Sequence, residues 1–181
     1  TIEDALNSIN YELIKCDTNA KYVSQRGCLH MINGDYYKAL EDFKRALELR
    51  IAANCQPDEL AMSYANLGHI YDNLHNFEES FSWAQKALEL RLKIFPESSL
   101  PVSSSYLQVG DMYYELKKKQ LAKEYFEKCL AIRLELYGPD HYLIGSPYCC
   151  LACLNSSEKQ HTKALEYFEK AVKIYTKSLG L

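Results

Sequence analysis

Three cysteines, Cys149, Cys150 and Cys153, form the densest group of reactive side chains in the sequence. On a helix, Cys150 and Cys153 would share one face and could serve thiol chemistry or bind a metal ion. A tetrahedral zinc site needs four ligands, and the nearest histidines, His141 and His161, form no second cluster with them. We therefore interpret the cysteines as small apolar residues of a protein core and predict no metal site.

The sequence contains no motif of a known catalytic centre. A P-loop, a dinucleotide fingerprint, G-x-S-x-G and H-E-x-x-H are all missing from it. We see no assembled set of acid, base and nucleophile, so we predict that the chain is not an enzyme and needs no cofactor. The lysine run 117–119 falls at an expected turn between two helices, and we interpret it as a solvated tip rather than a nucleic-acid contact.

The composition is that of an ordinary folded domain. Of 181 residues, 48% are hydrophobic and 25% are charged, and the net charge is −3. This charge argues against a general binder of nucleic acid, which normally carries a basic excess. No apolar run approaches the roughly 20 residues of a membrane span. Seven cysteines without a disulfide spacing indicate reduced thiols, so we expect a cytoplasmic protein.

A small residue recurs through the chain at intervals of 41, 42 and 42 positions, as Gly27, Gly68, Gly110 and Ala152. Without a large side chain there, a second helix can approach the first closely. Aromatic residues four positions before and three after the small residue would fill the remaining gap, and another small residue follows twelve positions later. These residues are Tyr64, Tyr71, Tyr106 and Tyr113 for the aromatic positions, and Ala39, Ala122 and Ala164 for the later small position.

This skeleton resembles the tetratricopeptide repeat, whose units are commonly about 34 residues long. The longer unit, the L-E-L-R segments at 47–50 and 88–91, and L-Y-G-P-D-H at 136–141 are similar to the long-unit form of kinesin light chains. The resemblance implies an all-α fold, a right-handed α-α superhelix of about four and a half helix-turn-helix repeats.

We place the complete repeats at residues 20–60, 61–102, 103–144 and 145–181. Ala5 lies 22 residues before Gly27, which is the spacing from a second helix to the next unit. Residues 1–19 are therefore predicted to be the second helix of a truncated repeat, and we expect the chain to begin inside an array.

In the family's fold, first helices line a concave groove that holds a partner. One groove position of successive repeats carries the amides Gln25, Asn66 and Gln108, which could donate to and accept from an extended peptide backbone. The alternative is that these amides only make an exposed helix face soluble. The resemblance places further groove residues at Lys21, Met62, His69, Leu107, Asp111 and Tyr114.

We predict a non-catalytic scaffold or adaptor that binds a partner protein in this groove. The groove residues are mixed and mildly apolar rather than basic, which favours an apolar or mixed peptide, extended or helical. The alternative is a self-association module. Repeat arrays need polar caps at their ends, and here the final helix carries the apolar pattern A-V-K-I-Y within residues 171–175.

Overall fold

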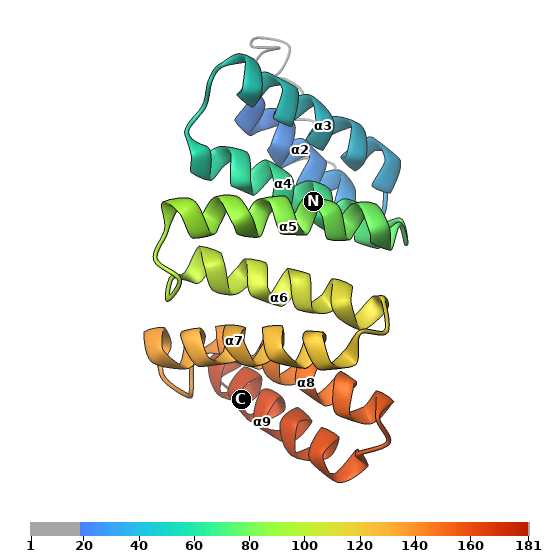
Figure 1. Cartoon of the computed structure of the whole chain (residues 1–181), viewed down its shortest axis with the longest axis vertical. Helices are drawn as coiled ribbons and strands as arrows, with labels where there is room; N and C mark the ends of the chain where they lie inside the picture. The colour runs from blue at the N-terminus through green and yellow to red at the C-terminus, as the bar shows by residue number, and fades with distance from the viewer. Residues whose placement is uncertain (1–18, 181) are drawn as a thin grey trace. The chain divides into compact units, whose positions relative to one another are not determined.

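The computed structural model describes residues 19–180, and within this range the chain is entirely helical apart from turns (Figure 1). The predicted truncated helix at residues 1–19 lies outside the described residues but for Asn19. The chain divides into two compact units, with unit 1 ending at Ile94 and unit 2 beginning at Phe95. The helices of unit 1 are α2 (Ala20–Ile32), α3 (Tyr36–Ala52), α4 (Pro57–Asn73) and α5 (Phe77–Ile94). Those of unit 2 are α6 (Leu100–Glu115), α7 (Lys119–Tyr137), the short 3-10 helix η1 (Tyr142–Ile144), α8 (Gly145–Ser157) and α9 (His161–Leu179).

The prediction of an all-α helical repeat fold is confirmed. Consecutive helices form the pairs α2/α3 and α4/α5 in unit 1, and α6/α7 and α8/α9 in unit 2. The predicted repeat starts at 20 and 145 coincide with the first residues of α2 and α8. In contrast, α4 begins at Pro57 and α6 at Leu100, before the predicted starts at 61 and 103. Proline suits a first turn because its fixed φ is helical and the missing N–H has no partner there.

The turn inside each helix pair contains one residue with positive φ. In the first pair it is Gly34, at φ +85°, within the turn Asn33-Gly34-Asp35. The other three pairs place His75, Lys117 and Lys159 in this conformation, at φ 57°, 61° and 62°. A side chain with a Cβ is strained there, whereas glycine is not. Three of the four turns therefore hold a residue that their backbone conformation disfavours.

Replacing Lys117 by glycine is expected to stabilise the protein by about 0.5–1 kcal/mol, because relief of the left-handed strain exceeds the added chain entropy of glycine. The measurement is the midpoint of urea unfolding. Lys118→Gly is the matched control, since Lys118 is also exposed but has φ −87°. The control should lower the midpoint. A lower midpoint for Lys117→Gly as well would contradict the strain argument.

The recurring small residues lie where two helices of a pair touch. A Cβ added to Gly27 would lie 2.8 Å from Phe43 Cε1, and one added to Gly110 would lie 2.6 Å from Phe126 Cε1. Gly68 is buried, and its carbonyl oxygen accepts a hydrogen bond from the Ser80 hydroxyl at 2.8 Å. Gly27 and Gly110 thus lie at close contacts between the two helices of their pairs.

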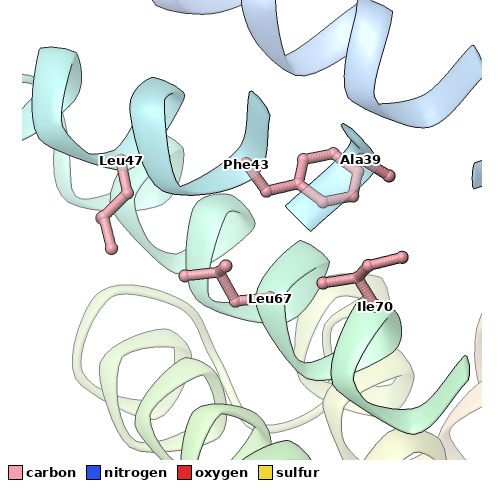
Figure 2. Close-up of a cluster of buried hydrophobic side chains, with 5 residues drawn as sticks. All are labelled: Ala39, Phe43, Leu47, Leu67 and Ile70. Atoms are coloured by element: carbon pink, nitrogen blue, oxygen red, sulfur yellow. The ribbon is translucent and has the colours of Figure 1, made fainter. Parts of the chain in front are cut away.

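Within each unit, the two helix pairs share one core. In unit 1, Phe43 and Leu47 of α3 pack against Leu67 and Ile70 of α4 (Figure 2). Each of these side chains is buried. Helix α3 therefore packs against α2 of its own pair and also against α4 of the pair that follows. In unit 2, Phe126 of α7 belongs to a cluster with residues of α8 in the same way. Stacking of this kind is what holds a repeat protein together.

An arginine at the end of a second helix reinforces each of these contacts. Arg50 of α3 donates to the Ser63 hydroxyl of α4 at 2.6 Å. Arg133 of α7 donates from Nη1 to the Leu143 carbonyl at 2.7 Å and to the Ser146 hydroxyl at 2.8 Å. Sequence analysis found the L-E-L-R segment that ends in Arg50 but gave the arginine no role. The structure shows that it reaches across to the next helix pair.

Candidate functional site

The first helices of unit 1, α2 and α4, carry five of the predicted peptide contacts. Asn66 of α4 donates from Nδ2 to the Ser24 hydroxyl of α2 at 3.2 Å, which ties the two helices together at the level of the predicted amide row. Gln25 is exposed beside Ser24, and Asn66 is half-buried. The unit 1 site, as we call it, consists of Lys21, Gln25, Met62, Asn66 and His69.

The two amides of this site differ in what they can still bind. One N–H of Asn66 is engaged by Ser24, which leaves its carbonyl oxygen and second N–H for a ligand. The exposed Gln25 amide offers both donor and acceptor groups. Met62 and Lys21 are also exposed, so an apolar, flexible side chain and a cation lie on the same helices as the amides.

His69 contributes a neutral ring to the unit 1 site. Part of its side chain is exposed, but surrounding protein desolvates the imidazole and this lowers the pKa of His69, with the positive charge of Arg91 as the second cause. Both effects disfavour the protonated form. At neutral pH the ring therefore serves as a hydrogen-bond partner rather than as a cation.

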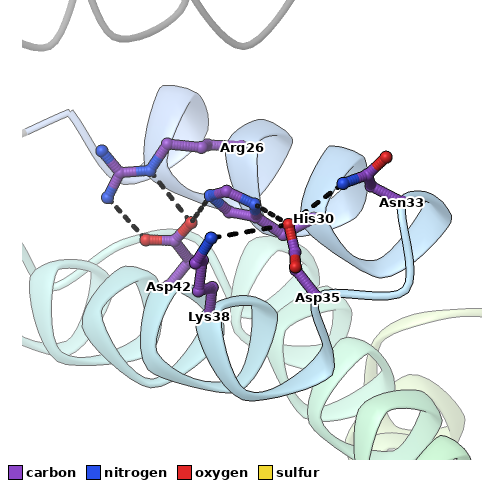
Figure 3. A network of polar contacts seen from close by, with 6 residues as sticks. All are labelled: Arg26, His30, Asn33, Asp35, Lys38 and Asp42. Carbon is purple, nitrogen blue, oxygen red and sulfur yellow. Dashed lines mark hydrogen bonds and ion pairs between the residues drawn. The ribbon is translucent and has the colours of Figure 1, made fainter. Parts of the chain in front are cut away.

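Charged side chains join helix α2 to helix α3. Arg26 makes a two-point contact with Asp42 of α3, from Nε to Oδ2 at 2.9 Å and from Nη2 to Oδ1 at 2.5 Å (Figure 3). His30 lies 3.9 Å from the same Asp42 carboxylate and 3.6 Å from that of Asp35. A two-point arginine–carboxylate contact fixes orientation as well as distance, so this network fixes α2 against α3.

Asp35, in the turn between α2 and α3, is the last residue of this network. Its carboxylate accepts a hydrogen bond from the Asn33 amide at 3.1 Å and lies 3.6 Å from the Lys38 ammonium. The hydrogen bond from Asn33 is the main cause that lowers the pKa of Asp35, and the charges of Lys38 and His30 add to it. Asp35 therefore stays ionised at neutral pH and keeps its contacts with both α2 and α3.

The predicted contacts of unit 2 are less accessible. Gln108 is only 4% exposed, so the third amide of the row does not offer a free surface like that of Gln25. Leu107 and Tyr114 are half-buried and pack against the core formed with α8. Asp111 is half-buried and accepts a hydrogen bond from the Cys150 thiol at 3.5 Å. The role of these four residues as peptide contacts stays a prediction.

The three cysteines of α8 lie in different environments. Cys150 packs against the unit 2 core, whereas Cys153 is exposed rather than buried as we expected for a core residue. Burial and, second, the Asp111 carboxylate raise the pKa of Cys150, and burial raises that of Cys149. Both thiols therefore stay protonated at neutral pH, which opposes nucleophilic chemistry. Within residues 19–180, no three His, Cys, Asp or Glu side chains come together in a way that could hold a metal ion.

None of the helices between residues 19 and 180 has both the length and the apolar character that crossing a bilayer requires.

The sequence model of the tetratricopeptide repeat matches residues 17–93 and 101–177, which together make up most of the chain. The chain belongs to the tetratricopeptide repeat family. The sequence-based resemblance is thereby confirmed. No curated protein sequence matches the chain.

Solved structures of other tetratricopeptide proteins share the fold. BtubC (BKLC) from P. vanneervenii is 21% identical, with a TM-score of 0.75 over 96% of this chain and 70% of that protein. A kinesin light chain-type protein with nearly identical TPR-like repeats, from Podosopora anserina, is 16% identical, with a TM-score of 0.71 over 98% and 88% of the two chains. The apo form of RapI is 17% identical, with a TM-score of 0.78 over 97% and 63%. At these identities the similarity establishes the tetratricopeptide fold alone.

Sequence reasoning missed the buried charged residues that join helices within each unit. Asp42, Arg50 and Arg133 are charged side chains that the structure buries. The available signal was the position of Arg50 and Arg133 at the ends of segments that recur in register, L-E-L-R at 47–50 and L-A-I-R at 130–133. The partner of Arg26 lies 16 residues away, and no local pattern relates the two.

Proposed function

We propose that this tetratricopeptide protein is a non-catalytic scaffold that holds a segment of a partner protein against the first-helix face of unit 1. The single observation that carries the proposal is the exposed Gln25 amide next in sequence to Ser24, which accepts a hydrogen bond from Asn66 of α4. The fold itself supports a binding role, because repeat arrays present extended surfaces to partners.

The chemistry of the unit 1 site favours an extended segment with an apolar side chain. Two amides can pair with a peptide N–H and C=O whatever the sequence of the peptide. Exposed Met62 offers apolar contact that adapts its shape to a ligand side chain, and neutral His69 adds a hydrogen-bonding group. Lys21 is the only cation among the five residues, so we do not expect a strongly acidic peptide to be preferred.

The double substitution Gln25→Ala and Asn66→Ala tests this proposal. Peptides selected from a displayed library of random 12-residue sequences on the unchanged protein serve as the probe, and their affinities are measured by calorimetry. Loss of two backbone-directed hydrogen bonds should weaken binding by roughly 10-fold. Gln120→Ala is the control, since Gln120 is an exposed amide on the second helix α7. Selected peptides that bind the double variant as tightly as the unchanged protein would refute the unit 1 site.

A further inference from the structure

Lysine side chains gather at one edge of unit 2, where the turn between α6 and α7 lies beside the turn between α8 and α9 (Figure 1). The Lys119 ammonium joins the two turns, because it donates a hydrogen bond to the Ser157 carbonyl at 2.8 Å. Residues 115–119 and 157–163 together hold five lysines and two glutamates, a net charge of +3, whereas the whole chain carries −3. We call the five lysines the basic edge: Lys117, Lys118, Lys119, Lys159 and Lys163.

Most of the basic edge is not used in ion pairs of the fold. Four of its lysines are exposed and form no ion pair within the part of the chain that the structure describes, namely Lys117, Lys118, Lys159 and Lys163. Lys117 and Lys118 lie only over the rings of Tyr114 and Tyr113, at 5.8 and 5.9 Å. Their ammonium groups are therefore available to an anionic ligand.

Both second helices of unit 2 begin at this edge. The N-terminus of a helix carries a partial positive charge, which an acidic residue in the first turn offsets. Neither α7 nor α9 has an acidic residue in its first turn, and neither is capped by a side chain. Helix α5 of unit 1, in contrast, begins with Glu78 and Glu79. The two helix ends therefore add to the positive potential of the lysines.

The lysines of the basic edge work against the stability of the fold. Lys119 and Lys163 lie in the first turns of α7 and α9, where a positive charge is unfavourable. Lys117 and Lys159 have positive φ, at 61° and 62°, where the first helix pair has Gly34. Residues held in a disfavoured conformation cluster at functional sites. The basic edge is thus better explained by a ligand than by folding.

The size of the basic edge favours a short acidic segment as this ligand. Exposed charges interact only over about 8–10 Å at physiological ionic strength, so a short segment at the edge is attracted by its local charge. A bilayer or a nucleic acid is larger than the edge and would also face the rest of the chain, which carries −6 because the whole chain carries −3. Six extended residues reach about 20 Å, which is enough to span helices packed about 8–10 Å apart.

We propose that the basic edge binds an acidic segment of a partner protein. Carboxylates of this segment contact the lysines of both turns and accept hydrogen bonds from the first N–H groups of α7 and α9. This surface is independent of the unit 1 site, because the two share no residue, so either can be refuted without the other.

Fluorescence anisotropy of a labelled peptide with six consecutive glutamates tests the proposal. The full 181-residue chain should bind the peptide with a dissociation constant of roughly 0.1 mM at about 50 mM salt. Raising the salt to about 200 mM should weaken binding at least about threefold, because exposed charges are screened. The same peptide with glutamine in place of glutamate should not bind. Equal binding of both peptides, or no saturation up to about 1 mM protein, would overturn the proposal.

Charge reversal shows whether both turns contribute. Lys118→Glu and Lys163→Glu alter one turn each; each should weaken binding about threefold, and the double variant about 10-fold. Both place an acidic residue at the start of a helix, which favours folding. The matched control is Lys44→Glu/Lys86→Glu, which changes the net charge equally at exposed positions of unit 1 and should weaken binding less than about twofold. Equal weakening by the two double variants, or normal binding by either Lys118→Glu or Lys163→Glu, would overturn the proposal.

Competition tests the class of partner. Unlabelled hexaglutamate peptide, vesicles with about 30% phosphatidylserine and single-stranded DNA are each added to the labelled complex at the same concentration of negative charge. The unlabelled peptide should displace the label most strongly. Stronger displacement by the vesicles or by the DNA would overturn the assignment to an acidic protein segment.

Discussion

Replacing Gly110 by leucine is expected to destabilise unit 2 by about 1–3 kcal/mol. Even the first added carbon would lie 2.6 Å from Phe126 Cε1 and 3.3 Å from Tyr125 Cβ, and Phe126 is only 1% exposed, so its ring has no free space into which to move. Overpacking of this kind costs more than the roughly 0.5–1 kcal/mol that leucine gains over glycine as a helix former. Urea unfolding measured by circular dichroism gives the free energy of unfolding.

Two comparisons make the glycine experiment specific. Ala131→Leu adds bulk to an exposed position of the same unit and should change the free energy of unfolding by less than about 0.5 kcal/mol. Combining Gly110→Leu with Phe126→Ala should cost less than the sum of the two single changes, because the smaller side chain makes room for leucine. Strict additivity would mean that the two residues do not compete for the same space.

Replacing Arg133 by alanine should have an effect of similar or larger size, about 2–4 kcal/mol. Arg133 is 4% exposed, and its guanidinium donates to the Leu143 carbonyl and the Ser146 hydroxyl at the junction of α7, η1 and α8. Its removal leaves the Leu143 carbonyl with only the 3.5 Å hydrogen bond from the Ser146 hydroxyl and opens a cavity, and both consequences lower the free energy of unfolding. The readout is again urea unfolding.

Two other arginine variants show what Arg133 contributes. Arg133→Lys keeps the charge but presents a compact ammonium instead of a planar set of donors, so it should recover only part of the loss. Arg45→Ala removes an exposed arginine whose contact is Glu48 on the same helix, and it should cost less than about 1 kcal/mol. Equal effects of Arg133→Ala and Arg45→Ala would exclude the bridging role of Arg133.

The candidate site could be only partly predicted. The helices that carry Gln25 and Asn66 were located correctly, because the repeat period relates them directly to Gly27 and Gly68. The exposure of each amide could not be predicted in this way. Gln25 and Gln108 occupy the same position of their repeats, yet one is exposed and the other buried, since burial depends on side chains that come from other parts of the chain.

The sequence by itself determined the helical repeat fold and the close-contact positions Gly27 and Gly110, because these follow from residue types that recur at a fixed period along the chain. Only the tertiary structure decided which polar groups meet, such as Arg26 with Asp42 and Arg133 with Ser146, and which of the equivalent phenylalanines Phe43, Phe126 and Phe168 are buried. The physical reason is that helix periodicity depends on residues within one repeat. Burial and ion pairing depend instead on the distances between helices, which cannot be read from any single segment of the sequence.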